Sequence, residues 1–375
     1  MRSLFFLFFP FLVFSQDTIK SSNDSVPLFS NDTINTDTLS AKEINFQDSI
    51  KELNLNNLNL KKSRDYYNTA LELMREKKYN EAIIKLNKSI TIDSLFVNAF
   101  LRRAECYFFT NKDSAIINYL HVFSLDSTMV KCLYEIANIE IEFDENAAFK
   151  TYSRIINFDN NQSQAYYKRG VILFSRKKYE EAIKDFSNSL DILKDAYTYN
   201  ERAACYRMLG MLDKAEDDYL ASITLNSDLS FVYNNLGSVL RKQGFKEKAL
   251  IYYNFSITKD STYFIAYNNR AGLLIENNDF ETAIKDIDKC LDINPKYAPA
   301  FNNRGVYKHS KKDYKAAVED FNQAIHLNEN YAKAYLNRGI SKQMIRDEYG
   351  ACQDWKKASL FNISIANKYL ISDCE

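Results

Sequence analysis

Two consecutive stretches of the sequence repeat one another and decide the fold. Residues 264–297 read FIAYNNRAGLLIENNDFETAIKDIDKCLDINPKY, and residues 298–331 read APAFNNRGVYKHSKKDYKAAVEDFNQAIHLNENY. In both stretches a small residue follows Asn-Asn-Arg, and an alanine stands 12 residues further on. Self-similarity at a period of 34 residues is typical of proteins that stack identical supersecondary units.

The same spacing runs through most of the chain. A small residue recurs every 33 or 34 positions, at Ala70, Ala104, Ala137, Gly170, Ala203, Gly237, Ala271, Gly305 and Gly339. A series of alanines follows it by 11 or 12 positions, at Ala82, Ala115, Ala148, Ala182, Ala215, Ala249, Ala283, Ala317 and Ala351. Large apolar residues stand four positions before the first series and four after the second. Because residues four apart share a helix face, each repeat predicts two helices that pack through a small and a bulky side chain.

This period and pattern resemble the tetratricopeptide repeat. The resemblance covers about residues 63–365 in nine copies, although a proline at the repeat end survives only as Pro295 and repeats two and three are one residue shorter. It implies an all-α fold, a right-handed α-solenoid superhelix of about nine helical hairpins. We expect residues 366–375 to form a short C-terminal cap, because a terminal repeat needs its open face covered.

Composition argues against several classes of function. The 375 residues carry 49 Lys plus Arg and 49 Asp plus Glu, so the chain lacks the bulk positive charge of a nucleic-acid binder. Its three histidines, His121, His309 and His326, are widely spaced and offer little material for a metal site or a histidine base. We therefore expect no catalytic residue, no cofactor and no metal.

The N-terminus predicts export. An apolar run of 11 residues from Leu4 to Phe14 follows a short basic start. About 20 residues are needed to cross a bilayer, so residues 1–15 are interpreted as a cleaved signal peptide, with a membrane anchor as the alternative. We expect a periplasmic, outer-envelope-associated or secreted protein with no integral membrane span after cleavage.

Residues 16–62 predict a disordered polar tether, because they are rich in Ser, Thr, Asn and Asp and lack a sustained helical period. Within them an Asp, a hydroxyl residue and an aliphatic residue recur as a triplet, beginning at Asp17, Asp24, Asp32, Asp37 and Asp48. The triplet resembles the acceptor sequence for O-linked glycans in some exported bacterial proteins, so glycosylation is one hypothesis. Chance in a segment of this composition is the other.

A charged pair recurs with the repeat. In five repeats an arginine stands directly before the small residue, and an aspartate stands 16 positions after that arginine. The pairs are Arg169 with Asp185, Arg202 with Asp218, Arg270 with Asp286, Arg304 with Asp320 and Arg338 with Asp354. Where Leu236 replaces the arginine, Tyr252 replaces the aspartate, and only Arg103 lacks its acid, with Asn118 in that place. This co-occurrence predicts structural ion pairs between the two helices of a hairpin.

The resemblance places the first helix of each hairpin along a concave groove. There the sequence puts a row of asparagines, Asn200, Asn234, Asn235, Asn268, Asn269, Asn302, Asn303 and Asn337. A side-chain amide complements a peptide bond, so the row predicts a site for an extended polypeptide. It resembles the asparagine ladder in the tetratricopeptide half of eukaryotic O-GlcNAc transferase. The alternative is that these are solvated consensus residues.

The early repeats predict a more apolar inner surface. Its aromatic members include Tyr67, Phe108, Tyr134 and Tyr167. Either this surface takes an apolar segment of a partner, or the leucines of the tether cover it, which are Leu53, Leu55, Leu58 and Leu60.

The six cysteines fall into two groups. Cys106, Cys132, Cys205 and Cys290 occupy repeat positions that favour buried thiols. Cys352 and Cys374 lie at equal distances from residue 363, so an antiparallel cap would bring them level, and we expect a disulfide between them.

The sequence as a whole favours a non-catalytic scaffold outside the cytoplasm that binds a polypeptide or partner proteins in its groove. The alternative is a cell-envelope glycan binder or envelope-assembly component, with the groove tyrosines stacking on sugars.

Overall fold

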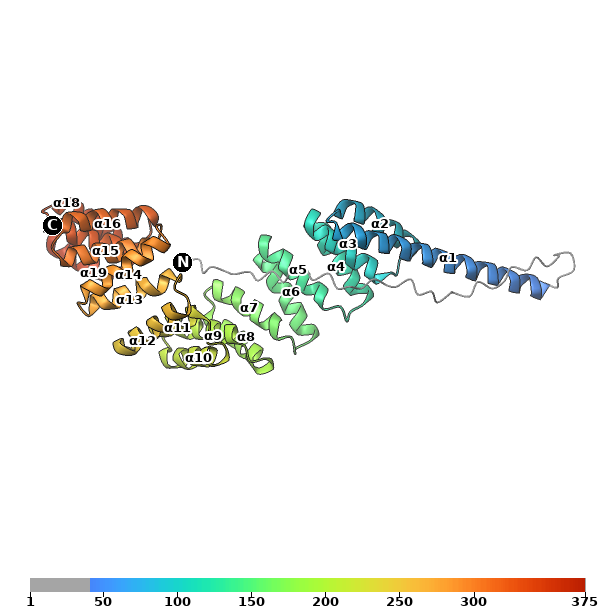
Figure 1. Ribbon diagram of the computed structural model, residues 1–375, viewed down its shortest axis with the longest axis horizontal. Helices are drawn as coiled ribbons and strands as arrows, with labels where there is room; N and C mark the ends of the chain where they lie inside the picture. Colours follow the sequence, from blue (N-terminus) through green and yellow to red (C-terminus); the bar gives the residue numbers. More distant parts are fainter. Residues whose placement is uncertain (1–40, 375) are drawn as a thin grey trace. The chain divides into compact units, whose positions relative to one another are not determined.

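The structure, a computed structural model, describes residues 41–374 and is helical throughout that range, without strands. Within this range consecutive helices pair into nine hairpins followed by a single terminal helix. Figure 1 shows the order of these helices along the chain. The helices are α1 (Ala41–Arg75), α2 (Tyr79–Ile92), α3 (Val97–Thr110), α4 (Lys112–Leu125), α5 (Lys131–Phe143), α6 (Glu145–Phe158), α7 (Ser163–Ser175), α8 (Tyr179–Ile192), α9 (Ala196–Met208), α10 (Leu212–Leu225), α11 (Ser230–Gln243), α12 (Lys246–Lys259), α13 (Phe264–Glu276), α14 (Phe280–Ile293), α15 (Ala298–Ser310), α16 (Tyr314–Leu327), α17 (Ala332–Met344), α18 (Glu348–Leu360) and α19 (Ser364–Asp373). The predicted all-α hairpin array with a C-terminal cap is confirmed.

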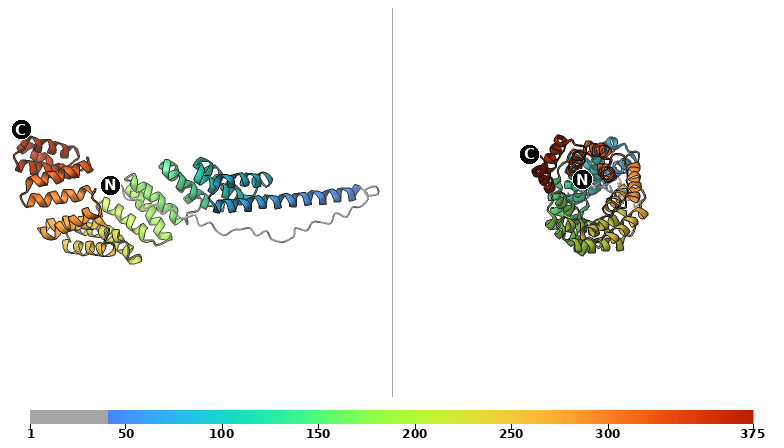
Figure 2. Two further views of the ribbon diagram at one scale, coloured as in Figure 1. Left: turned by 45° about the horizontal axis from the view of Figure 1, so that its top comes forward. Right: turned by 90° about the vertical axis from the view of Figure 1, so that its left-hand side faces the viewer.

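The chain divides into two compact units, residues 1–165 and residues 166–375. The N-terminal unit contains α1 to α6. Its first helix is 35 residues long and projects beyond α2 to α4 in both Figure 1 and the left view of Figure 2. The prediction of a disordered tether is therefore wrong for residues 41–62, which form the first part of α1.

The sequence explains why this helix extends so far. No glycine or proline occurs between Pro27 and Gly170, and asparagine lowers helix propensity without interrupting a helix. Leu53, Leu55 and Leu58 are exposed on α1, so they do not cover the aromatic surface of the early repeats. The signal peptide and the first four Asp-hydroxyl-aliphatic triplets lie outside the described residues.

Small residues allow the two helices of each hairpin to approach closely. A Cβ atom on Gly305 would lie 2.6 Å from Cε1 of Phe321, and one on Gly339 would lie 2.5 Å from Nε1 of Trp355. Both aromatic side chains are almost fully buried. The aromatic ring of the second helix thus occupies the space left by the missing side chain of the first, which is the packing that the two sequence series predict.

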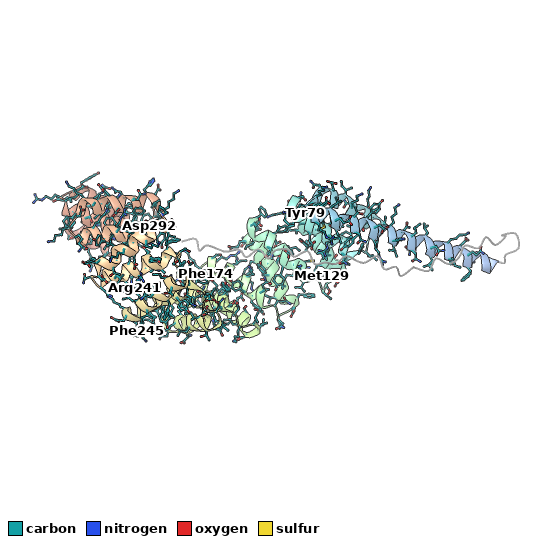
Figure 3. All side chains as sticks on the ribbon, viewed as in Figure 1. Tyr79, Met129, Phe174, Arg241, Phe245 and Asp292 are labelled. Atoms are coloured by element: carbon teal, nitrogen blue, oxygen red, sulfur yellow. A yellow bond between two sulfur atoms is a disulfide. The ribbon has the colours of Figure 1, made fainter. Side chains whose placement is uncertain are left out.

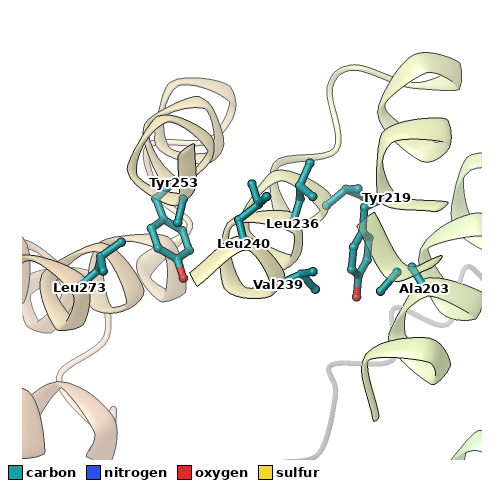
Figure 4. Close-up of a cluster of buried hydrophobic side chains, with 10 residues drawn as sticks. Ala203, Tyr219, Leu236, Val239, Leu240, Tyr253 and Leu273 are labelled. Atoms are coloured by element: carbon teal, nitrogen blue, oxygen red, sulfur yellow. The ribbon is translucent and has the colours of Figure 1, made fainter. Parts of the chain in front are cut away.

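The core of the C-terminal unit lies between successive hairpins. Figure 4 shows one such cluster, in which Tyr219 and Tyr253 flank Leu236 and Leu240. Leu236 takes the place of the repeating arginine and is fully buried, with Tyr252 packed against the same cluster. In this hairpin, apolar packing in the cluster takes the place of the ion pair.

The final helix closes the array. In α19, the ring of Tyr369 stacks on that of Trp355 at 4.8 Å between centroids. Cys352 of α18 and Cys374, directly after α19, form a disulfide. The cap begins at Ser364, two residues before the predicted start.

Candidate peptide-binding face

Five arginines bind the five aspartates that the sequence pairs with them. The shortest contact in each pair measures 2.5 to 2.8 Å, and every aspartate is at most 6 % exposed. Asp320 also contacts Lys308 at 2.8 Å, and Asp354 contacts Lys342 at 3.0 Å. Each pair joins the two helices of one hairpin, so its role is structural.

The asparagine row forms a ladder of hydrogen bonds between hairpins. The Nδ2 atom of one asparagine donates to Oδ1 of an asparagine 35 residues earlier, from Asn235 to Asn200 at 3.1 Å, from Asn269 to Asn234 at 2.8 Å, from Asn303 to Asn268 at 2.9 Å and from Asn337 to Asn302 at 2.9 Å. We call Asn200, Asn234, Asn268 and Asn302 the inner amides, and Asn235, Asn269, Asn303 and Asn337 the outer amides.

The two sets differ in access to solvent. The inner amides are 3 to 6 % exposed, whereas the outer amides are only partly buried. An inner amide cannot contact a ligand while the ladder is intact. The expectation that all eight asparagines bind a polypeptide therefore applies only to the outer four.

The ladder defines a face of the C-terminal unit. Its bonds join α9 to α11, α11 to α13, α13 to α15 and α15 to α17, so these helices lie side by side, and we call their shared surface the A-helix face. Arg241 of α11, labelled in Figure 3, forms an ion pair with Glu276 of α13 across the same face. The face is thus rich in amides and carries a few fixed charges.

Two charged residues take the repeat position of the outer amides in the preceding hairpins. Glu201 accepts one hydrogen bond, from Nδ2 of Asn200 at 3.1 Å, and burial raises the pKa of its carboxyl to about 6. Burial lowers the pKa of Lys168. Within residues 41–374 neither side chain forms an ion pair. Neither residue was identified from the sequence, although both stand at the repeat position that asparagine occupies in the later hairpins.

The aromatic residues of the early repeats differ in their access to solvent. Tyr67 is 1 % exposed and packs in the core with Ala70 and Leu86, so it cannot reach a ligand and cannot serve as a platform for a sugar. Its hydroxyl is close to the guanidinium of Arg102 from the next hairpin. Phe108, Tyr134 and Tyr167 are partly exposed, and the hydroxyl of Tyr134 donates to Oε1 of Gln162 at 3.1 Å.

A serine and a histidine meet between α15 and α17, but the serine lacks the access to solvent that catalysis needs. Nδ1 of His309 lies 2.8 Å from Oγ of Ser341, and burial lowers the pKa of the imidazole. Ser341 is 0 % exposed, so a substrate cannot reach its hydroxyl. The contact joins α15 to α17 and is part of the stacking.

Other kinds of site find little support in the part of the chain that the structure describes. Residues 41–374 hold no group of three His, Cys, Asp or Glu side chains that could bind a metal ion, and none of their helices is both long and apolar enough to span a membrane. The four remaining cysteines are free and buried, and burial raises the pKa of each thiol to about 12.

Known proteins match parts of this chain. Sequence models of the tetratricopeptide repeat match residues 163–195, 265–297 and 298–331. DnaJ homolog subfamily C member 7 of Homo sapiens is 26 % identical over 147 residues, which cover 35 % of this chain and 29 % of that protein. A 58 kDa phosphoprotein of Plasmodium berghei is 36 % identical over 72 residues, covering 19 % and 17 %. This chain thus spans less than a third of the length of these relatives.

Solved structures share the architecture. The Cut9–Hcn1 hetero-tetramer of APC/C has a TM-score of 0.54 at 15 % identity and covers 84 % of this chain and 76 % of that one. A tetratricopeptide repeat protein from Parabacteroides merdae has a TM-score of 0.53 at 16 % identity, covering 65 % and 98 %. At these identities the likeness shows the fold alone. With their repeating small and aromatic residues, and with repeat models that match residues 163–195 and 265–331, the helical hairpins of this chain contain tetratricopeptide repeats.

Proposed function

We propose that the A-helix face holds an extended polypeptide, and that the protein acts as a non-catalytic scaffold outside the cytoplasm. The tetratricopeptide-repeat fold supports the general role of a protein-interaction scaffold, because a solenoid presents a long surface made of equivalent positions. The proposal that the A-helix face holds an extended polypeptide depends on the outer amides.

The outer amides carry the proposal. Each donates an amide proton to the ladder, and within residues 41–374 the Oδ1 atoms of Asn235, Asn303 and Asn337 accept no hydrogen bond. Oδ1 of Asn269 accepts one long bond, from Asn268 at 3.5 Å, and Nδ2 of Asn303 also donates to the carbonyl oxygen of Asn268 at 3.2 Å. The amide oxygens and the remaining amide protons complement the N–H and C=O of a peptide bond. The ladder also fixes the orientation of each side chain, so little conformational entropy remains to be lost on binding. Four such groups on four successive hairpins fit a ligand that repeats its hydrogen-bonding groups, as a polypeptide backbone does.

The charge of Glu201 beside the ladder indicates how a bound polypeptide would be oriented along the A-helix face. Glu201 stands at the α9 end of the outer amides and has a carboxylate with one hydrogen bond. A basic side chain or amino terminus of the ligand would give this carboxylate the counter-charge that it lacks within the described residues. We therefore favour a polypeptide whose basic group lies at the α9 end.

The proposed location has one structural support. The disulfide between Cys352 and Cys374 is of a kind that persists in oxidising compartments. Fractionation of cells that express the tagged chain should place it in the envelope or the medium, and retention in the cytoplasm with both thiols free would contradict the location.

A peptide selection tests the binding face. Random 12-residue peptides displayed on phage are selected against the purified protein, and their affinities are measured for variants. Replacing both Asn269 and Asn303 with alanine should weaken the selected peptides roughly tenfold, as expected for the loss of two hydrogen-bonding groups.

Two controls separate contact from stability. Asn268→Ala breaks the same ladder bond as Asn303→Ala but leaves the outer amide in place, and Asn188→Ala removes a partly buried amide from α8. Unchanged affinity in the Asn269 and Asn303 double variant, or an equal loss in Asn268→Ala, would contradict a role of the outer amides in binding.

A further inference from the structure

Arg103 occupies the place of the paired arginines in hairpin α3–α4, but it faces no carboxylate of the residues that the structure describes. Its Nε donates to Oδ1 of Asn118 at 2.8 Å, and its Nη1 donates to Oδ1 of Asn87 at 2.7 Å. Within residues 41–374 it forms no ion pair, and burial lowers the pKa of its guanidinium. Its positive charge is therefore half-buried without a counter-charge.

Comparison with an intact pair shows what Arg103 lacks. In Arg202, Nη1 binds Ser187 in the preceding hairpin, while Nε and Nη2 bind the two oxygens of Asp218 at 2.7 and 2.8 Å. At Arg103 the side-chain nitrogen of Asn118 turns away to donate to the carbonyl oxygen of Ser114. Among residues 41–374, Nη2 of Arg103 thus has no hydrogen-bond acceptor, and no carboxylate balances the charge of its guanidinium.

A surface hollow of about 500 Å³ lies beside this arginine. Phe100, Ile117, Leu120 and His121 line it together with Arg103. Ile117 is 66 % exposed and Leu120 is 39 % exposed, although both are aliphatic. The hollow therefore offers a cation next to an uncovered aliphatic wall, which fits a ligand with a carboxylate close to an aliphatic side chain.

We propose that this hollow is the docking site of an Asp-hydroxyl-aliphatic triplet from the chain's own N-terminal segment, at Asp17 or Asp24. In an extended segment, residues i and i+2 point to the same side, so the aspartate and the aliphatic residue of one triplet face the hollow together. The aspartate supplies the acceptor and the charge that Arg103 lacks, and the aliphatic side chain covers Ile117 and Leu120.

The length of the chain before α1 allows this docking. The part of α1 from Ala41 to Ser63, whose hydroxyl contacts that of Ser89 in α2, extends ~33 Å at 1.5 Å per residue. About 24 residues separate Asp17 from Ala41 and about 17 separate Asp24 from it, and extended segments of these lengths reach ~80 Å and ~56 Å. The triplets at Asp32 and Asp37 begin within about 10 residues of α1 and reach at most ~33 Å, so we assign the first two.

Site-specific photo-cross-linking tests the proposal in the full chain. Benzoylphenylalanine replaces Leu120, and the cross-linked peptides are identified by mass spectrometry in protein whose intact mass equals that of the bare polypeptide. The matched control carries the same group in place of Leu220, which is 38 % exposed and holds the equivalent position on α10. We expect cross-links within one chain from position 120 to peptides containing residues 17–26, at least about fivefold above the control.

Charge variants then test the recognition. Replacing Asp17 and Asp24 with asparagine leaves every hairpin residue unchanged, so a lower yield cannot reflect unfolding of the repeats. We expect the cross-link yield to fall roughly three- to tenfold, as for loss of a charged hydrogen bond. Asn118→Asp, which gives Arg103 its own carboxylate, should lower the yield as well.

Three results would each overturn the proposal. They are a yield at position 120 no higher than at position 220, an unchanged yield in the double aspartate variant, and cross-links that join two chains, which would assign the hollow to a second copy. None of these results bears on the A-helix face, because the hollow is built by α3 and α4 alone.

Discussion

The side-chain amide of Asn269 donates to Oδ1 of Asn234 across 2.8 Å and thereby joins α13 to α11. Asn234 is 3 % exposed, so this contact satisfies an amide that would otherwise be buried without a partner. The asparagine row is thus first a stacking device, and only its outer members remain available to a ligand. A buried polar group that loses its partner costs about 1 to 3 kcal/mol, which makes the ladder testable through stability.

The inner amides should contribute to stability more than a partly buried asparagine outside the ladder does. Asn268→Ala removes the acceptor of the bond from Asn303 and should lower the free energy of unfolding by about 1 to 3 kcal/mol in denaturant titrations. Asn188→Ala, in which no ladder bond is lost, should stay within about 0.5 kcal/mol of wild type. Equal effects of the two substitutions would mean that the ladder adds no stability.

The buried carboxylate of Asp320 should be hard to replace. Asp320→Asn leaves Arg304 and Lys308 without their counter-charge, and a broken buried pair costs about 3 to 5 kcal/mol. The melting temperature should fall accordingly while the affinity for a peptide on the A-helix face is unchanged. Glu319→Gln removes the neighbouring exposed carboxylate and serves as the control. A melting curve of Asp320→Asn that matches this control would refute the pairing.

The unpaired arginine predicts a stabilising substitution. Asn118→Asp gives Arg103 the carboxylate that five other hairpins already accept at this position, and we expect a gain of about 0.5 to 1.5 kcal/mol in unfolding free energy. The gain should vanish when Arg103 is replaced with glutamine, so a double-mutant cycle isolates the pair. A gain that survives the loss of Arg103 would have another origin.

Glu201 should make stability depend on pH. Because its folded-state pKa is raised from 4.5 to about 6, the folded protein holds this proton more tightly than the unfolded chain does. The resulting stabilisation is complete below about pH 4.5 and is lost as the pH rises through about 6, a difference of ~2 kcal/mol.

A neutral substitute isolates this effect. Glu201→Gln should be more stable than wild type at pH 7, and the two proteins should converge near pH 4.5 in denaturant titrations. A constant difference between them across this range would show that the carboxyl does not titrate as its burial requires.

The terminal disulfide should stabilise the cap. It closes a loop of 22 residues, and a loop of this size corresponds to about 3 kcal/mol of unfolded-state entropy. Replacing Cys352 and Cys374 with serine should lower the melting temperature and raise hydrogen exchange first in α19. If both thiols react with an alkylating agent in protein purified without reductant, the bond is not formed in the isolated protein.

Sequence alone predicted the contacts that lie within one hairpin. The pairing of Arg304 with Asp320 and the fit of Phe321 against Gly305 span 16 residues each and follow from helix periodicity alone. The link between Cys352 and Cys374 also follows from position, because the cap folds back along the preceding helix.

Contacts between hairpins were harder to predict from the sequence. The sequence indicated that Asn268 and Asn269 lie near one another but not which of them is buried. The sequence indicated that Tyr67 lies on the inner surface of the early repeats, yet the structure places its side chain in the core. Adjacent residues on a helix differ by about 100° in direction, so a small rotation of one hairpin against the next exchanges the buried side chain for the exposed one.

The period of 34 residues by itself determined the hairpins, their number and the pairing of charges within them, because each depends on local helix geometry. Only the tertiary structure decided that the inner amides hydrogen-bond between hairpins and that Arg103 faces an open hollow. These features depend on how whole hairpins rotate and stack against one another, and that arrangement is set by the summed packing of many side chains rather than by any local pattern.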